Sequence, residues 1–204
     1  MIEPAIPAVT VAITGASGTA YGLRLIQCLD AKLVNTHLLI SAAGRSVAAL
    51  EGKYQLPTAP DRLRDYLTEQ LSLEADHLHV YSPEDWQSPL ASGSSAPRRM
   101  VVCPCSMGSL AAIAGSHANN LIERAADVVL KERGDLIVVP RETPLCSTHL
   151  EHMLNLSRCG ATILPAAPAF YHHPNDIQGL IDYIVARILD HLAIEHDLIQ
   201  RWGE

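Results

Sequence analysis

The chain has 204 residues, of which 48% are hydrophobic but only 4% aromatic, and it carries 15 basic against 22 acidic residues. The length suits one domain, so we expect residues 1–204 to form a single unit with a core of Ala, Val, Leu and Ile. The net charge of −7, without a long basic run, argues against a nucleic-acid partner. No apolar run reaches membrane-spanning length and no signal peptide is recognisable, which favours a cytoplasmic protein with no membrane contact.

Apolar runs with strand character alternate with stretches of helical periodicity along the chain. In chain order we expect a strand at 8–14, a helix at 18–33, a strand at 36–41, helices at 42–51 and about 61–71, a long loop at 82–99, a strand at 100–104, helices at 106–116 and 120–133, a strand at 135–140, a helix ending at Gly160, a strand opening 161–174, and a last helix at about 175–192.

Strands separated by helices indicate a parallel, doubly wound sheet, so the expected fold is a three-layer α/β sandwich of the Rossmann or flavodoxin-like kind. Ligands of such folds bind beyond the carboxyl ends of the strands. This rule selects four loops as the candidate site. They are residues 15–19, 41–45, 104–109 and 140–145.

The first of these loops reads Gly15-Ala16-Ser17-Gly18. Its glycines let the backbone approach a ligand, Ser17 offers a hydroxyl, and the helix that follows presents N–H groups to a phosphate. A glycine turn needed only for its geometry would look the same.

Hydroxyl groups also follow other expected strands. Ser41 ends the second strand, and Ser106 and Ser109 open a helix, although each serine could simply be a helix cap. Arg141 and Glu142 follow the 135–140 strand, where a charged pair is an odd structural choice and favours a functional role.

Four more side chains could bind an anion. Arg124 and Lys131 lie two turns apart on one helix, Tyr171 follows another strand end, and Arg187 belongs to the last helix. Solvated surface groups are the alternative for each of them.

Six stretches in this order carry a resemblance: "TGASG…YGLRL", "PCS" before a small-residue helix, "NNLIERAADVVLKER", "VPRETP", "LPAAPAFYH" and the final "RWGE". The chain resembles the flavin prenyltransferases of the UbiX type over essentially its whole length. The resemblance implies one flavoprotein domain that joins reduced FMN to dimethylallyl monophosphate and yields prenylated FMN. A separate decarboxylase then uses this product as its cofactor. It also implies a homo-oligomer, commonly a dodecamer, with sites at subunit contacts.

The resemblance assigns roles to the candidate residues. The implied flavin-binding residues are Gly15, Ala16, Ser17, Ser41, Ser106, Met107, Gly108, Ser109 and Arg141. The implied residues around the allylic phosphate are Arg124, Lys131, Tyr171, Arg187 and the covering Trp202. The implied catalytic residues are Ser17, Glu51 and Glu142, with Glu142 as proton donor to the leaving phosphate.

In the implied reaction the prenyl group becomes bonded to N5 and then C6 of the flavin. Two arginines, a lysine and a tyrosine can stabilise a departing phosphate without a metal, so we expect no magnesium. The chain departs from the family pattern at Ser109, where the family often has Thr, and at Ala42, where it often has Lys. The first change keeps a hydroxyl, and the second affects a peripheral contact.

Two other functions share this kind of fold. One is a flavin-dependent decarboxylase of peptide cysteines or pantothenoylcysteine, but the chain has neither its histidine after the first helix nor its "PxMNxxMW" motif. The other is a non-catalytic FMN carrier, which would need no second phosphate site.

Overall fold

The computed structural model describes residues 8–52, 54–200 and 203. Its centre is a six-stranded parallel sheet in the order β3-β2-β1-β4-β5-β6. The strands are β1 (Ala8–Ile13), β2 (Asn35–Ile40), β3 (Leu78–Tyr81), β4 (Arg99–Cys105), β5 (Asp135–Pro140) and β6 (Thr162–Ile163).

The helices connect these strands in sequence. They are α1 (Thr19–Asp30), α2 (Ala42–Leu50), α3 (Pro60–Leu71), α4 (Met107–Ala114), α5 (Leu121–Lys131), α6 (Ser147–Arg158) and α7 (Ile177–His191), with short 3-10 turns η1 (Ala75–His77) and η2 (Pro89–Ala91).

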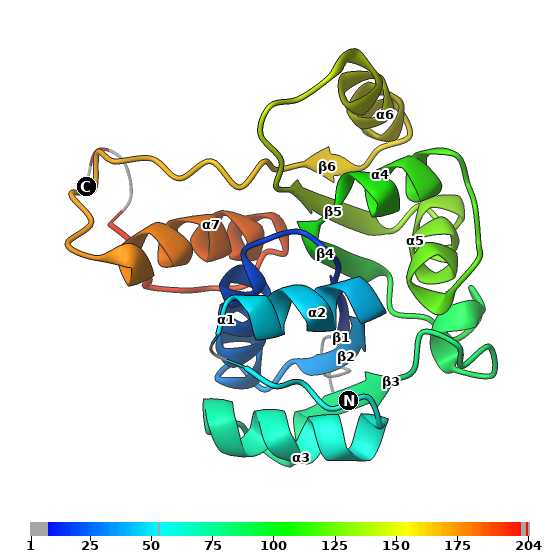
Figure 1. The fold of residues 1–204 in the computed structure, drawn as a ribbon, viewed down its shortest axis with the longest axis horizontal. Coiled ribbons are helices and arrows are strands. Elements are labelled where there is room, and N and C mark those ends of the chain that lie inside the picture. The colour runs from blue at the N-terminus through cyan, green and yellow to red at the C-terminus, as the bar shows by residue number, and fades with distance from the viewer. Residues whose placement is uncertain (1–7, 53, 201–202, 204) are drawn as a thin grey trace, which may run out of the picture.

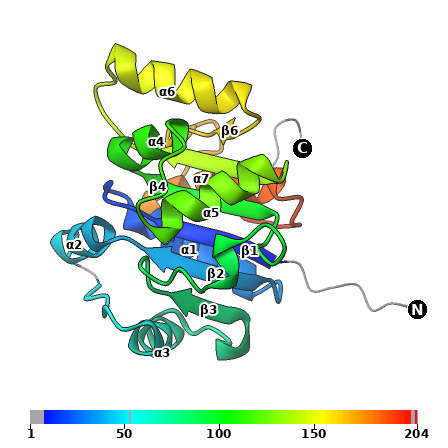
Figure 2. The same cartoon turned by 90° about the vertical axis from the view of Figure 1, so that its right-hand side faces the viewer.

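The sheet is covered on both faces (Figures 1 and 2). Successive side chains of β1 are buried on opposite faces of the sheet. Val11 and Ile13 belong to one buried cluster, and Ala12, between them, belongs to the other. The first cluster includes residues of α1, α3 and α7, and the second includes residues of α4, α5 and α6. Burial on both faces explains why the central strands are continuous apolar runs rather than alternating ones. The expected three-layer α/β fold is confirmed.

One strand was absent from the expected elements. β3 is a four-residue edge strand, Leu78–Tyr81, in which His79 is exposed, so its sequence has neither the length nor the apolar character of the central strands. The long loop expected at 82–99 contains η2 and ends where β4 begins at Arg99. The other expected elements are present, with ends shifted by a few residues, as usual for helix and strand boundaries.

The strand order reverses between β1 and β4, because β1 leads into α1 on one face and β4 leads into α4 on the other. Thr14 links the two strand ends at this point. Its buried hydroxyl donates to the Pro104 carbonyl oxygen at 2.9 Å and accepts the Ser106 N–H at 2.8 Å. The crevice at such a reversal is where doubly wound sheets bind their ligands.

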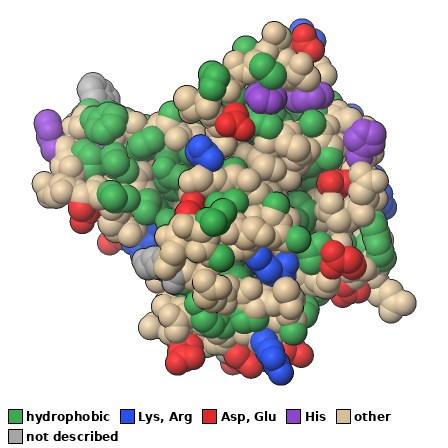
Figure 3. All heavy atoms as spheres, in the orientation of Figure 1, with side chains coloured by type: hydrophobic (Ala, Val, Ile, Leu, Met, Phe, Trp, Pro, Cys, Tyr) green, Lys and Arg blue, Asp and Glu red, His purple; other side chains and the backbone are tan. Residues whose placement is uncertain are grey.

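Residues 164–176 form an arm that runs outward from β6 to the start of α7 (Figure 1). Hydrophobic side chains gather on the surface of this arm (Figure 3). Phe170 is 68% exposed there, and Ile177, at the start of α7, is 75% exposed. Within the described residues, no helix combines the length and apolar character needed to cross a membrane.

We predict that Thr14→Val lowers the free energy of unfolding by about 1–3 kcal/mol, because it removes a buried acceptor and leaves the Ser106 N–H without its partner. Thr14→Ser keeps the hydroxyl and serves as the matched control. It should lose only the contribution of one methyl group, about 1 kcal/mol. Urea denaturation of the three proteins measures the difference, and equal losses in the two variants would contradict this role of the hydroxyl.

Candidate active site at the carboxyl edge of the sheet

The loop between β1 and α1 is built for close backbone contact. A Cβ atom added at Gly15 would lie 2.6 Å from the Ala43 Cβ, and Gly18 has a φ of +106°, a value that side-chain-bearing residues rarely adopt. Ala16 between them is buried, whereas Ser17 is exposed. The loop therefore holds Ser17 at the surface of the β1 strand end.

Glu51, the C-cap of α2, reaches across to this loop. Its Oε1 accepts the Ser17 hydroxyl at 2.8 Å and the Gly18 N–H at 2.6 Å, and its Oε2 accepts the Thr19 N–H at 3.2 Å. Burial by itself would raise the pKa of Glu51, but these hydrogen bonds outweigh it and hold the pKa below its usual range. The carboxylate is thus stabilised as an anion at the positive end of α1.

This arrangement corrects one expectation. The first N–H groups of α1 were expected to be open to a phosphate, but those of Gly18 and Thr19 donate to the Glu51 carboxylate. The reason is tertiary, because α2 brings an acid from 33 residues away onto the helix end. An incoming phosphate would have to find its donors elsewhere along this edge.

Two other helices begin at the same edge with serine caps. The Ser41 Oγ accepts the Gly44 N–H at 2.9 Å, and the Ser106 Oγ accepts the Ser109 N–H at 3.3 Å and donates to the Ser109 Oγ at 3.1 Å. The capping role that the sequence left open is therefore present. A single cap satisfies only part of a helix start, so α2 and α4 retain N–H groups for an anion.

The start of α4 is also sterically open. Met107 and Gly108 form its first turn, and a Cβ added at Gly108 would meet no atom within 4 Å. Small residues at 42 and 43 leave the start of α2 equally uncovered, and both alanines there are exposed. The first turns of both helices are therefore accessible at this edge of the sheet.

Arg141 and Glu142 follow β5 at the same edge. The Arg141 Nε donates to the Ser17 carbonyl oxygen at 3.1 Å, so this cation joins the ends of β5 and β1. Glu142 is exposed and accepts the N–H of Thr143 at 3.0 Å. A cation and an acid are therefore present beside the Ser17–Glu51 pair.

Tyr171 and Arg187 meet around a third residue, Tyr183 of α7. The Tyr171 and Tyr183 ring centroids lie 6.0 Å apart, and Arg187 follows Tyr183 by one turn on the same helix face. Arg187 forms an ion pair with Asp190 at 2.5 Å. The chain brings these two predicted residues into one neighbourhood around Tyr183.

Arg124 and Lys131 lie on α5, away from that neighbourhood. Arg124 pairs with Asp127 at 2.9 Å and donates to the Ala91 carbonyl oxygen at 3.0 Å. Lys131 ends α5, near the amino end of β5, and pairs with Glu132 at 2.5 Å. Within one chain these four groups do not converge, since Lys131 at the end of α5 lies toward the opposite edge of the sheet from Arg141, which follows β5.

Trp202, predicted to cover the substrate, lies outside the described residues. Two residues of interest are absent from the sequence predictions. Thr14 could have been found as a hydroxyl ending an otherwise apolar strand, next to the glycine loop. Tyr183 had no such signal, because it belongs to an ordinary amphipathic helix and its contact with Tyr171 depends on how the arm folds back.

Comparisons with known proteins agree with this architecture. A family model described as Flavoprotein matches residues 3–189. The chain is 53% identical to the flavin prenyltransferase UbiX of Pseudomonas aeruginosa over 196 residues, which cover 96% of this chain and 94% of that protein.

Two solved structures have a fold similar to that of this chain. The crystal structure of AnUbiX (PadA1) in complex with FMN and dimethylallyl pyrophosphate has a TM-score of 0.85 and 37% identity, covering 97% of this chain and 98% of that one. A dodecameric FMN-dependent UbiX-like decarboxylase from Escherichia coli O157:H7 has a TM-score of 0.84 and 37% identity, covering 97% and 100%.

The lowered pKa of Glu51 predicts a pH dependence of stability. Its contribution is fully present above the ordinary glutamate pKa of about 4.3 and is lost as the pH falls through the lower folded-state value. The difference in unfolding free energy between wild type and Glu51→Gln should therefore be constant near neutral pH and shrink in acid. Urea denaturation across this pH range measures it.

Ser17→Ala provides the comparison, because it removes one of the donors to the same carboxylate. It should reproduce part of the acid-dependent difference. A gap between wild type and Glu51→Gln that widens as the pH falls would contradict the assigned sign.

Proposed function

Because the chain belongs to the Flavoprotein family and, within it, to the UbiX-type flavin prenyltransferases, we propose that it joins the dimethylallyl group of dimethylallyl monophosphate to N5 and C6 of reduced FMN. The observation that carries this proposal is the 53% identity to a flavin prenyltransferase over nearly the whole length of both chains. We further propose that residues 1–204 act as one domain and that the protein works in the cytoplasm.

The flavin would lie at the carboxyl edge, in the crevice between β1 and β4. The proposed binding residues are Gly15, Ala16, Ser17, Ser41, Ser106, Met107, Gly108, Ser109 and Arg141. Open helix starts at α2 and α4, small residues and the Arg141 cation support this assignment, since together they suit an anionic phosphate and a polar ring edge. When bound, reduced FMN would supply the N5 and C6 positions that accept the prenyl group.

The protein would have to stabilise the departing phosphate. Breaking the allylic C–O bond leaves the electron pair on the phosphate oxygen and positive charge on the prenyl carbons. Arg124, Lys131, Tyr171 and Arg187 can offset the phosphate charge by charge-assisted hydrogen bonds, without a metal. Glu142, exposed beside Arg141, would donate a proton to the leaving phosphate, while the Ser17–Glu51 hydrogen bond would help move a proton at the flavin.

We propose that Arg124 and Lys131 act in the site of a neighbouring subunit, in a homo-oligomer that we expect to be a dodecamer. Their position on α5, separate from Arg141 within one chain, supports this. The exposed Phe170 and Ile177 at the arm are further support, because large apolar side chains in one patch are typical of contact surfaces. The product, prenylated FMN, would pass to a separate decarboxylase that uses it as cofactor.

The first test is anaerobic incubation of the purified protein with reduced FMN and dimethylallyl monophosphate, without added metal, followed by mass spectrometry of the extracted flavin. We expect a flavin heavier by one prenyl unit. The same incubation with dimethylallyl diphosphate measures the preference between the two donors. Unmodified FMN from protein that binds both ligands would overturn the proposed function.

Two variants test the roles proposed for Glu142 and Lys131. Glu142→Gln and Lys131→Ala should each lower the rate of prenylation by about tenfold or more, since each removes a group that acts on the leaving phosphate. FMN affinity should remain within about twofold of wild type in Lys131→Ala. A wild-type rate in either variant would contradict its assignment.

Subunit sharing makes a separate prediction. Lys131→Ala and Ser17→Ala, each impaired alone, should regain part of the activity when mixed and reassembled, because some sites then combine an intact Lys131 with an intact Ser17. Light scattering gives the subunit number in parallel. Mixtures no more active than the average of the two variants would show that both residues act within one chain.

A further inference from the structure

Arg187 belongs to a chain of three charged or polar side chains centred on Asp190. The Asp190 Oδ2 lies 2.5 Å from the Arg187 Nη1, and the Asp190 Oδ1 lies 3.1 Å from the His196 Nε2. The Arg187 side chain is 45% exposed, that of Asp190 27% and that of His196 only 5%. A buried imidazole thus holds the carboxylate that holds the exposed guanidinium.

His196 lies in the segment that follows α7. Because a carboxylate can only accept, the imidazole proton on Nε2 faces Asp190, and this fixes the tautomer of a neutral ring. The other nitrogen, Nδ1, is buried and has no hydrogen-bond partner among the described residues. The ring therefore directs its polar contact to Asp190, and replacing it by an apolar ring would disturb little else.

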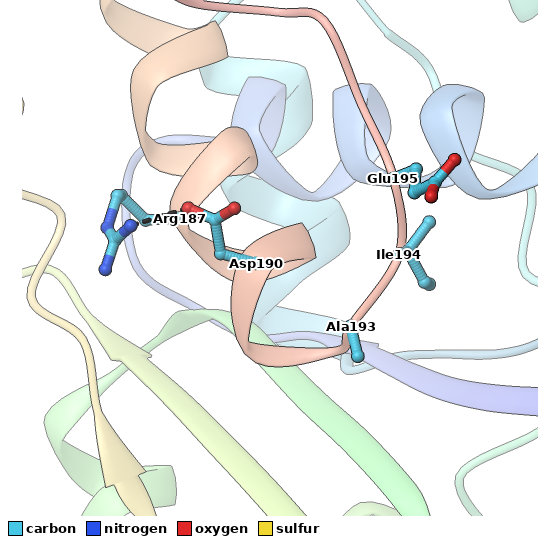
Figure 4. A pocket seen from close by; sticks show the side chains of 5 residues that line it. All are labelled: Arg187, Asp190, Ala193, Ile194 and Glu195. Atoms are coloured by element: carbon cyan, nitrogen blue, oxygen red, sulfur yellow. Dashed lines mark hydrogen bonds and ion pairs between the residues drawn. The ribbon is translucent and has the colours of Figure 1, made fainter. Parts of the chain in front are cut away.

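Arg187 and Asp190 border a hollow of about 460 Å³, whose other lining residues are Ala193, Ile194 and Glu195 (Figure 4). Figure 4 shows Glu195 on the opposite side of the hollow from the Arg187 guanidinium. The guanidinium is thus paired with Asp190 on the side of the hollow away from the second carboxylate. The guanidinium stays on the helix face that also carries Tyr183, the residue that packs against Tyr171.

We propose that Asp190 and His196 are positioning residues that hold Arg187 ready for the allylic phosphate. This inference rests on the proposed function, since it requires Arg187 to contact that phosphate. A long arginine side chain loses much rotamer freedom on binding, and an ordered one loses less. His196 gives the Asp190 carboxylate a second donor, so Asp190 stays hydrogen-bonded when the guanidinium turns partly toward the substrate.

The test is a steady-state kinetic comparison of the full-length protein with reduced FMN and varied dimethylallyl monophosphate. Asp190→Asn and His196→Phe should each raise KM for dimethylallyl monophosphate about fivefold, the effect expected for losing one partly exposed ion-pair contact. The kcat and the FMN affinity should stay within about twofold of wild type. His196→Gln places an amide N–H near the former Nε2 and should restore the wild-type KM.

A double-mutant cycle separates positioning from a general structural effect. In an Arg187→Ala background, Asp190→Asn should cause no further rise in KM, because its effect passes through the guanidinium. Glu195→Gln, which changes the other carboxylate of the same hollow, is the matched control and should leave KM unchanged.

Each contrary result has a definite meaning. Additive effects of Asp190→Asn and Arg187→Ala, a His196→Gln variant as impaired as His196→Phe, or a parallel loss of FMN affinity would overturn the positioning role alone. Absence of prenylated flavin from the wild-type protein would overturn the proposed function and this inference with it.

Discussion

The hydroxyl of Thr14 makes the contact on which the arrangement of the site depends. β1 and β4 are neighbours in the sheet, but the chain leaves them toward opposite faces, and the Thr14 N–H donates to the Pro104 carbonyl oxygen at 3.1 Å where they separate. By donating to the Pro104 carbonyl oxygen and accepting the Ser106 N–H, Thr14 ties the glycine loop to the start of α4. Arg141 adds a second tie from β5 to the same loop. The serines and the Ser17–Glu51 pair are thereby held at one edge by hydrogen bonds between side chains and the backbone of neighbouring strand ends.

The sequence predicted most of the fold because buried parallel strands and amphipathic helices have distinct apolar patterns. It missed β3, which is short and half exposed, so its pairing with β2 depends on the sheet already being formed. At the site, local residue types identified Ser17, Ser41, Ser106 and Arg141. The contact of Glu51 with α1 could not be read locally, because it joins residues more than 30 positions apart. The family resemblance supplied Glu51, whereas Asp190 and His196 had neither a motif nor a resemblance to mark them.

The basic groups proposed for the phosphate are spread over two parts of one chain, and each arginine or lysine among them already has an acidic partner. Arg124 pairs with Asp127, Lys131 with Glu132 and Arg187 with Asp190. Such pairing is expected in a chain in which acidic residues outnumber basic ones, with a net charge of −7. Because each cation is already partly neutralised, a phosphate would need several of them to converge on it. Convergence from two subunits would meet that requirement.

The two outer strands of the sheet, β3 and β6, limit how copies of this chain can associate. β3 has four residues and β6 has two, so each outer strand offers few unpaired backbone groups to a foreign strand. Long flat outer strands invite uncontrolled growth of a sheet from one molecule to the next, and short ones discourage it. Contacts between copies would then involve side chains on the helices and the arm, where shape and charge select the partner. The short outer strands therefore make fibrous aggregation through strand pairing unfavourable, whatever contacts the helices and the arm form.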